Sequence, residues 1–407
     1  MNSLAQNIQQ LANKTIRNQI REIIQPGNLQ QVFKQEVNAI ISQALNQQLQ
    51  VERDTLLERE PYQRKSGAVS RNGYKRSKIP GIFGLLSLRK PVVRKGTLKL
   101  PLLKALKQAG KHLSEFLALH FWLKGSSTRA TAKTVNAALG TKLSHTTISK
   151  ISNALEPTLK LWEKRPLPQD IVYLFVDALY LPVKRPGFTS KQALFVALGM
   201  NDKGERYFLG YMLGDRESQD SWSAFIKQLL ARGLNRDILK LVISDEHKGI
   251  EAAVNDVLGI PMQLCVIHKM RNIRYRVAAP DREAFIRDFK AIFWENSLME
   301  AKQALGKLEG LWQKSYPKAV KLTLERFDDF SRFFNEPKAF WTILRSNNLT
   351  ERFNCELRRR LRPAGTMHSE LEVSKLVWAV SQAQEERWGN RKIYYHQKYQ
   401  NQEEVAA

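Results

Sequence analysis

Cysteine is scarce in this sequence. Only Cys265 and Cys355 occur among 407 residues, so a disulfide framework and a four-cysteine zinc site are both excluded, and the composition suits a reducing compartment. No apolar run approaches the roughly 18 residues that a membrane span needs, and the glutamine-rich first residues lack the basic-then-apolar layout of a signal peptide. We therefore expect a cytoplasmic protein that does not associate with membranes.

Acidic residues are also few relative to basic ones. The 39 Asp and Glu residues face 65 Lys and Arg residues, which leaves a net charge of +26 spread along most of the chain. Such an excess attracts phosphate backbones irrespective of sequence, and this attraction weakens with salt. Charge alone fits a ribosomal or packaging protein equally well. The length and the patterned core described below favour a larger protein of two or three domains.

The N-terminal part is predicted to be mainly helical around a small β-element. Residues 1–58 are polar with apolar residues at helical spacing, such as Ile16 and Ile20, and predict two or three helices. Pro26–Gly27 separates the first two. Residues 59–105 alternate apolar and basic residues between glycines and predict a small, strongly basic β-element.

Residues 106–165 contain a candidate helix-turn-helix. One helical pattern ends at Gly140, and a second begins after Ser144, a favoured N-cap residue, with Ile148 in its apolar stripe. The second helix opens with polar side chains that can reach base edges and phosphates. A helical hairpin that serves only packing fits the same pattern.

The remaining chain predicts an α/β catalytic core. Residues 166–280 contain three apolar runs and then alternate helices with strands, giving the order βββ-α-β-α-β-α of a ribonuclease-H-like mixed sheet flanked by helices. Residues 281–345 are aromatic-rich and predict an all-helical insertion, whose aromatic residues form its core or, as a minor alternative, stack on distorted DNA. Residues 346–396 return to the core with a further helix, and 397–407 form a polar tail.

Two carboxylates follow apolar runs in this predicted core. Asp177 and Asp245 each come at or near the end of a strongly apolar strand, where a buried charge needs a partner or a metal ion and where ligands gather in α/β sheets. Glu351 lies in a helix start, and Asn354 and Arg358 share its face because they follow three and seven residues later.

Three carboxylates suit two divalent ions. Mg²⁺, with Mn²⁺ also tolerated, takes oxygen ligands, and two such ions support in-line displacement at phosphorus without a covalent protein nucleophile. In this hypothesis Asp177 bridges both ions, Asp245 holds one and Glu351 holds the other. In a chain with 39 acids, some lie near strand ends by chance. The rivals Asp215 and Glu246 are less clearly at a strand end.

Several long blocks occur along the chain in a characteristic order: RNGYKR, GSSTRATAKTVNAALG, VDALYLPV, LGMNDKGERYFLGYMLGDRESQDSWSAFIKQLLARGL, SDEHKGIEAAV, CVIHKMRNI and NNLTERFNCELRRR. In these blocks the chain resembles the mutator-type transposases of bacterial insertion sequences and their eukaryotic relatives. The resemblance places the family's acidic triad on Asp177, Asp245 and Glu351. These acids are separated by 68 (245 − 177) and 106 (351 − 245) residues, and the helical insertion accounts for the longer gap.

The resemblance also singles out His247, Cys265 and His268. The Cys-x-x-His element of the family matches Cys265 and His268, which implies that His268 lines the active site near a phosphate while Cys265 packs. A zinc site is a minor alternative, because no further cysteine cluster completes a tetrahedral set.

The chain departs from the family pattern at two places. The usual Gln-Arg-Cys reads Gln263-Leu264-Cys265, and the common Thr-Thr-Asn reads Ser346-Asn347-Asn348. The missing arginine removes a potential phosphate contact, but the triad is intact. We therefore expect an active enzyme.

The resemblance implies a function on double-stranded DNA. The N-terminal region would bind the terminal inverted repeats, and the core would nick DNA and join the exposed 3′ hydroxyl to target DNA, as a homodimer or larger assembly associated with the bacterial nucleoid. The alternatives are a ribonuclease-H-like nuclease or resolvase and a non-catalytic DNA-binding regulator. The side chains expected to contact DNA are Arg71, Lys75, Arg76, Arg129, Ser144, His145, Thr146, Thr147, Lys150, Lys269, Arg271, Arg352 and Arg359.

Overall fold

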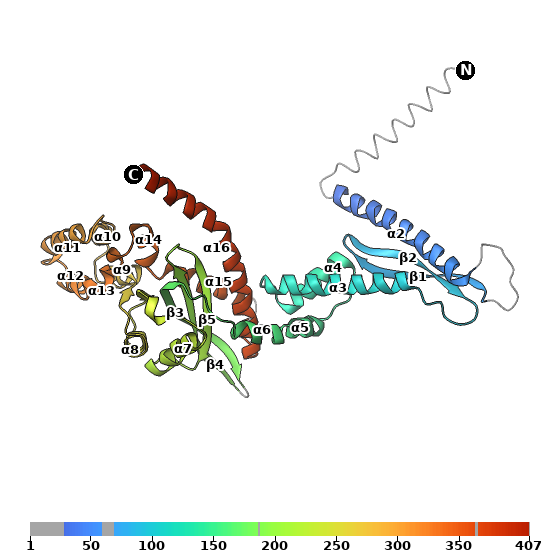
Figure 1. Ribbon diagram of the computed structural model, residues 1–407, viewed down its shortest axis with the longest axis horizontal. Coiled ribbons are helices and arrows are strands. Elements are labelled where there is room, and N and C mark those ends of the chain that lie inside the picture. Colours follow the sequence, from blue (N-terminus) through green and yellow to red (C-terminus); the bar gives the residue numbers. More distant parts are fainter. Residues whose placement is uncertain (1–27, 59–68, 186–187, 363–364, 407) are drawn as a thin grey trace, which may run out of the picture. The chain divides into compact units, whose positions relative to one another are not determined.

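The computed structural model describes residues 28–58, 69–185, 188–362 and 365–406. The chain divides into two compact units, residues 1–154 and 155–407 (Figure 1). The helices expected before residue 28, with Ile16, Ile20 and the break at Pro26–Gly27, lie outside the described residues. No helix in the described part is both long enough and apolar enough to cross a membrane.

The first unit combines helices with one β-hairpin. Its elements are α2 (Asn28–Leu57), β1 (Arg71–Gly81), β2 (Gly84–Val93), α3 (Pro101–Leu123), α4 (Thr128–Leu139) and α5 (His145–Asn153). The basic β-element predicted from the sequence is the antiparallel pair β1 and β2. Its apolar face, which includes Ile79 and Leu88, packs on Leu49 of α2 and Leu103 of α3. Burial of this face stabilises a hairpin that would be marginal alone.

The two predicted helices after α3 are confirmed, with their caps. Helix α4 ends at Gly140, which is in the left-handed conformation with φ of 66°, as glycine at this position commonly is. A Cβ at Gly140 would lie 2.6 Å from the side chain of Leu85. Helix α5 begins after Ser144, whose hydroxyl oxygen accepts a hydrogen bond from the backbone N–H of Thr147 at 3.1 Å. Ile148 of α5 is buried against apolar residues of α3 and α4.

A five-stranded mixed sheet forms the centre of the second unit. Its strands are β3 (Ile171–Arg185), β4 (Phe188–Asn201), β5 (Arg206–Gly214), β6 (Leu241–Ser244) and β7 (Met262–Leu264). The order across the sheet is β5-β4-β3-β6-β7, with β3, β4 and β5 antiparallel and β6 and β7 parallel to β3. The predicted succession βββ-α-β-α-β-α is confirmed. The fifth strand was expected over the run MQLCVI, residues 262–267, but it ends at Leu264. The backbone N–H of Val266 donates to the carbonyl oxygen of Arg345 instead, and Val266 is the first residue of α9 (Val266–Arg274).

Helices cover both faces of this sheet. They are α6 (Glu156–Glu163), α7 (Gln219–Ala231), α8 (Lys248–Val257), α9 (Val266–Arg274), α10 (Arg282–Phe293), α11 (Leu298–Trp312), α12 (Pro317–Leu324), α13 (Phe327–Ser331), α14 (Trp341–Leu344), α15 (Asn348–Leu361) and α16 (Glu370–Ala406), with short 3₁₀ turns at Arg236–Ile238, Arg332–Asn335 and Lys338–Phe340. Along β3, Leu174 and Val176 enter the apolar cluster shared with α7 and α8. Tyr173 and Phe175 enter the cluster shared with α10 to α16. This alternation is the two-residue period of a strand.

The aromatic-rich segment 281–345 is helical, as predicted, and its aromatic residues form a core. Phe327, Phe330, Phe333 and Phe334 are buried in the cluster that also covers the sheet. The insertion is joined to the sheet by Gln263 of β7, which is fully buried. Its amide donates to the carbonyl oxygen of Phe330 at 2.9 Å and accepts from the N–H of Phe333 at 2.9 Å.

Helix α6 lies with the second unit, although the sequence groups it with the helix-turn-helix segment 106–165. The ring of Trp162 stacks on Phe208 of β5 with centroids 5.4 Å apart, and Tyr211 lies 6.2 Å away. These contacts bury one face of α6 against β5.

The outer edge of β5 is occupied by side chains. The carbonyl oxygen of Phe208 accepts a hydrogen bond from Arg165 at 2.7 Å, and that of Leu209 accepts one from Arg232 at 2.8 Å. The N–H of Phe208 donates to Glu385 at 3.0 Å. These backbone groups of Phe208 and Leu209 are therefore satisfied within the chain.

Candidate functional site

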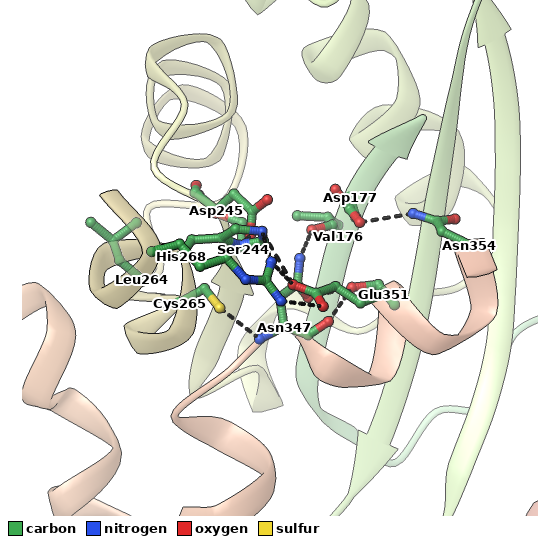
Figure 2. A network of polar contacts seen from close by, with 12 residues as sticks. Val176, Asp177, Ser244, Asp245, Leu264, Cys265, His268, Asn347, Glu351 and Asn354 are labelled. Atoms are coloured by element: carbon green, nitrogen blue, oxygen red, sulfur yellow. Dashed lines mark hydrogen bonds and ion pairs between the residues drawn. The ribbon is translucent and has the colours of Figure 1, made fainter. Parts of the chain in front are cut away.

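Two of the predicted carboxylates meet where β3 and β6 part. Strand β6 pairs with β3 as far as Phe175 and Ile243, and Asp245 directly follows the last residue of β6. Asp177 was expected at or near a strand end, but it lies in mid-strand, because β3 continues to Arg185 in pairing with β4. Asp177 instead marks the point at which β6 stops (Figure 2).

The carboxylate of Asp177 is held by two donors. Its Oδ1 accepts from the N–H of Ala178 at 2.9 Å, and its Oδ2 accepts from Nδ2 of Asn354 at 2.8 Å. Burial, and next the negative charge of Asp245, raise the pKa of Asp177 to about 7, against the opposing effect of these hydrogen bonds. A nearby cation would favour the charged form of Asp177.

Helix α15 brings Glu351 to this place, and Asn347 anchors its start. Asn347 is fully buried, and its side-chain amide donates to the carbonyl oxygen of Val176 at 3.0 Å. Its backbone N–H donates to Sγ of Cys265 at 3.2 Å, and its carbonyl oxygen accepts from the hydroxyl of Thr350 at 2.9 Å. The helix that carries Glu351 is thus fixed to the residue immediately before Asp177.

His268 links the other two acids. Its Nδ1 forms an ion pair with Asp245, and its Nε2 lies 3.1 Å from Oε1 of Glu351. Hydrogen bonding to Asp245, and next to Cys265, raises the pKa of His268 to about 10, so the ring is a cation at neutral pH. Arg271 adds a second positive charge, with Nη1 and Nη2 at 3.2 and 3.3 Å from the two carboxylate oxygens of Glu351.

A second donor group overlaps this site. The ligand atoms of Asp245, Cys265 and His268 all lie within 4.8 Å of one another. A thiolate and an imidazole favour a softer ion such as Zn²⁺, which usually takes four protein ligands when its role is structural. Within the described residues this group supplies three.

The other residues singled out near the site lie around it. His247 is the N-cap residue of α8, and its Nε2 is 3.9 Å from Glu217. Arg358 is exposed, and among the described residues no contact joins it to the three acids. Lys269 is 5% exposed, with Nζ 3.9 Å from Glu246 and above the ring of Phe330.

The residues expected to contact DNA differ in their surroundings. Arg71 bonds Asp54, Ser144 caps α5, Arg271 bonds Glu351 and Arg359 bonds Glu356. Thr147 is half-buried. The other exposed members of the set are Lys75, Arg76, Arg129, His145, Thr146, Lys150 and Arg352.

Two residues of the site carried no recognisable signal in the sequence. Asn347 stood out only as a departure from a motif, and its role depends on Val176, 171 positions away. Glu217 follows β5 and lies beside His247. Burial and the charge of Asp245 raise its pKa, whereas His247 lowers it. Its position in a polar loop gave no indication of this environment.

Comparison with known proteins identifies relatives along most of the chain. The family model described as "Transposase, Mutator family" matches residues 11–391. The transposase for insertion sequence element IS905 of Lactococcus lactis is 31% identical over 78% of this chain and 81% of its own length. The transposase for IS256 in transposon Tn4001 of Staphylococcus aureus is 28% identical over 89% of this chain and 92% of its own. A solved Mos1 transposase paired-end complex aligns over 50% of this chain and 77% of that chain, at 11% identity, with a TM-score of 0.18.

Proposed function

The chain belongs to the Mutator family of transposases, and on this premise we propose that it binds the terminal inverted repeats of its insertion sequence and catalyses metal-dependent DNA cleavage and strand transfer. The observation that carries the proposal is the convergence of three acids. Asp177 and Asp245 lie together where β3 and β6 part, and His268 links Asp245 to Glu351. We also infer a ribonuclease-H-like fold for the second unit, which the succession of three antiparallel strands and two parallel ones supports.

The charges of the site fit bound divalent cations. The pKa of Asp177 is raised by burial and by Asp245, whereas the two cations of the site, His268 and Arg271, bond Asp245 and Glu351. A cation beside Asp177 would therefore favour its charged form. Carboxylate oxygens are the ligands that Mg²⁺ prefers. We propose that Asp177, Asp245 and Glu351 hold two Mg²⁺ ions, for which Mn²⁺ can substitute. When bound, such ions would supply activation of the attacking hydroxyl and stabilisation of the leaving oxygen in an in-line displacement at phosphorus.

The neighbouring side chains position these ligands. Asn354 orients Asp177 through one hydrogen bond, and Asn347 fixes the start of the helix that carries Glu351. His268 and Arg271 are cations beside the acids, and in this proposal their N–H groups contact the phosphate of the bound DNA. No covalent bond between protein and DNA is required.

The DNA partners follow from the reaction. The basic first unit would bind the inverted repeats, and the exposed basic and polar residues of the chain would hold repeat and target DNA. Strand transfer of an element needs both of its ends, so we propose a homodimer or larger assembly on paired ends.

The test is strand transfer by Asp245→Asn. With Mg²⁺ or Mn²⁺ and DNA that carries the ends of the element, the wild-type protein should yield joined products. Asp245→Asn should abolish them while end binding stays nearly unchanged, because the substitution removes a metal ligand and not a DNA contact. Asp256→Asn, an exposed acid on α8, is the control and should keep full activity.

Two results would overturn parts of this proposal. Equal activity of Asp245→Asn and wild type would refute the metal-site assignment. Cleavage by the wild-type protein without any joined product would show a nuclease instead of a transposase.

A further inference from the structure

A polar groove of about 670 Å³ runs along the first unit between α2 and the hairpin. Figure 1 shows α2 lying alongside β2. Side chains of α2 bond the outer edge of that strand. The hydroxyl oxygen of Ser42 accepts from the N–H of Ser87 at 3.2 Å, and Oδ1 of Asn46 accepts from the N–H of Arg89 at 2.7 Å. These bonds hold helix and strand in fixed register, so the groove between them is preformed.

Two arginines face each other on the strand wall of this groove. Arg76 of β1 and Arg89 of β2 are directly opposite in the hairpin register, and both are exposed and line the groove. Like charges directly opposite in an antiparallel pair are destabilising. In the described part of the chain, neither guanidinium is paired with an acid and no acid lines the groove. The arrangement therefore favours a bound anion.

The helix wall presents uncharged hydrogen-bonding groups. Gln43, Gln47 and Gln50 line it together with Ser42 and Asn46. From Ala39 to Gln50 the helix wall extends for about 16 Å at 1.5 Å per residue. A duplex presents an unbroken row of phosphates along each strand, so a groove of this length can follow more than one consecutive phosphate. A single small anion would occupy only the arginine pair.

We propose that this groove binds the sugar–phosphate backbone of one strand of duplex DNA, with Arg76 and Arg89 on neighbouring phosphates and the amides of α2 on the adjoining sugar and phosphate oxygens. The inference rests on the proposed function and assigns part of its DNA binding to this surface.

Arg71 differs from the pair Arg76 and Arg89, although it lies on β1 with Arg76. Its guanidinium bonds Asp54 at 2.8 Å, and Arg53 bonds the same carboxylate at 2.6 Å. Arg53 also donates to the hydroxyl of Tyr74 at 2.8 Å. This cluster ties the end of α2 to the start of β1, so Arg71 supports the groove and does not contribute a free charge to it.

The experiment compares two double variants of the full-length protein. Arg76→Ala/Arg89→Ala removes the groove pair, and Lys104→Ala/Lys107→Ala removes the same charge from exposed positions on α3. Binding to a fluorescent duplex of arbitrary sequence is measured over a series of salt concentrations. The groove variant should bind about tenfold more weakly. The slope of log K against log salt should fall by about 2, because each arginine neutralises one phosphate. The α3 variant should stay close to wild type.

A second variant keeps both arginines. Gln47→Glu adds a negative charge to the exposed helix wall and should also weaken binding, because it repels the phosphates. Thermal unfolding controls for structural damage. The midpoint of Arg76→Ala/Arg89→Ala should be no lower than that of wild type, since a repulsive pair is removed.

The groove assignment is overturned if the Arg76→Ala/Arg89→Ala and Lys104→Ala/Lys107→Ala variants show the same affinity and salt slope. If strand transfer by the wild type is nevertheless observed and depends on Asp245, the proposed function stands without the groove. If the groove variant binds more weakly as expected but the wild type joins no DNA, the groove stands as a DNA site and the proposed function fails.

Discussion

Asn347→Ala removes the side chain that anchors the glutamate helix to β3. In the wild type, the side-chain amide of Asn347 donates to the carbonyl oxygen of Val176 at 3.0 Å. The variant loses this donor, and both residues are fully buried. An unsatisfied buried carbonyl costs about 1–3 kcal/mol. The hydroxyl of Thr350 loses its contact with the side-chain oxygen of residue 347 but keeps its bond to the backbone carbonyl oxygen of that residue, so its loss adds little to the cost. We expect the free energy of unfolding to fall by about 2 kcal/mol.

Asn347→Asp keeps the shape of the side chain but replaces the amide donor that faces Val176 with an acceptor. A carboxylate oxygen would face the carbonyl oxygen of Val176 with no N–H between them. The hydroxyl of Thr350 can still donate to one carboxylate oxygen, but no cation among the described contacts of this residue offsets the charge. A buried charge without such a partner costs about 3–5 kcal/mol, so Asp should be more harmful than Ala despite its better fit. Burial raises the folded-state pKa of the new acid. The added destabilisation should therefore be absent below the unfolded pKa of about 4 and grow as pH rises.

The assay is urea unfolding followed by tryptophan fluorescence at two pH values. Trp122 is the only tryptophan in residues 1–154, so the signal reports mainly on the second unit. Asn348→Ala changes the adjacent, exposed asparagine and should leave the midpoint unchanged. The reasoning fails if Asn347→Ala costs no more than Asn348→Ala, or if Asn347→Asp is as stable as wild type at neutral pH. Both Asn347 variants should also lose strand transfer, because Glu351 is no longer held beside Asp177.

Two further predictions concern other side chains. Asn354→Ala removes the donor to Oδ2 of Asp177 and should lower divalent-ion affinity about 10–100-fold, measured as the concentration of Mn²⁺ that gives half-maximal strand transfer; an unchanged concentration would exclude a positioning role. Burial raises the pKa of Glu385, so its stabilising contribution is complete below the unfolded pKa and is lost as pH rises through the folded one. Glu385→Gln should therefore gain stability relative to wild type as pH rises above the unfolded pKa of about 4, and a pH-independent difference in unfolding free energy would contradict this.

The sequence predicted most of the architecture because apolar runs report burial directly. The run LVIS became the fully buried strand β6, and Asp245 lies at its end as expected. The end of α4 at Gly140 and the start of α5 after Ser144 were also predicted correctly, since both residues act through local backbone geometry.

Three features of the site depend on contacts between distant segments, which the sequence does not show. Asp177 lies in mid-strand because pairing with β4 extends β3 to Arg185, and the point at which β6 stops beside it depends on a segment more than 60 residues away. Lys269 was expected to reach DNA, but it is 5% exposed and lies over Phe330 of the insertion. Glu351 was assigned from resemblance to a family, because its position relative to the other acids depends on the Asn347 anchor.

The occupied edge of β5 limits how copies of this chain can associate. An unpaired strand edge is a common template for joining two sheets into one continuous sheet. In β5 the groups that such a partner would need at Phe208 and Leu209 are already bonded to Arg165, Arg232 and Glu385. A second copy could add a strand there only by displacing all three side chains. Association of copies through this part of β5 would therefore break bonds already made within the chain, and we expect paired-end assembly to use other surfaces or the DNA itself as the bridge.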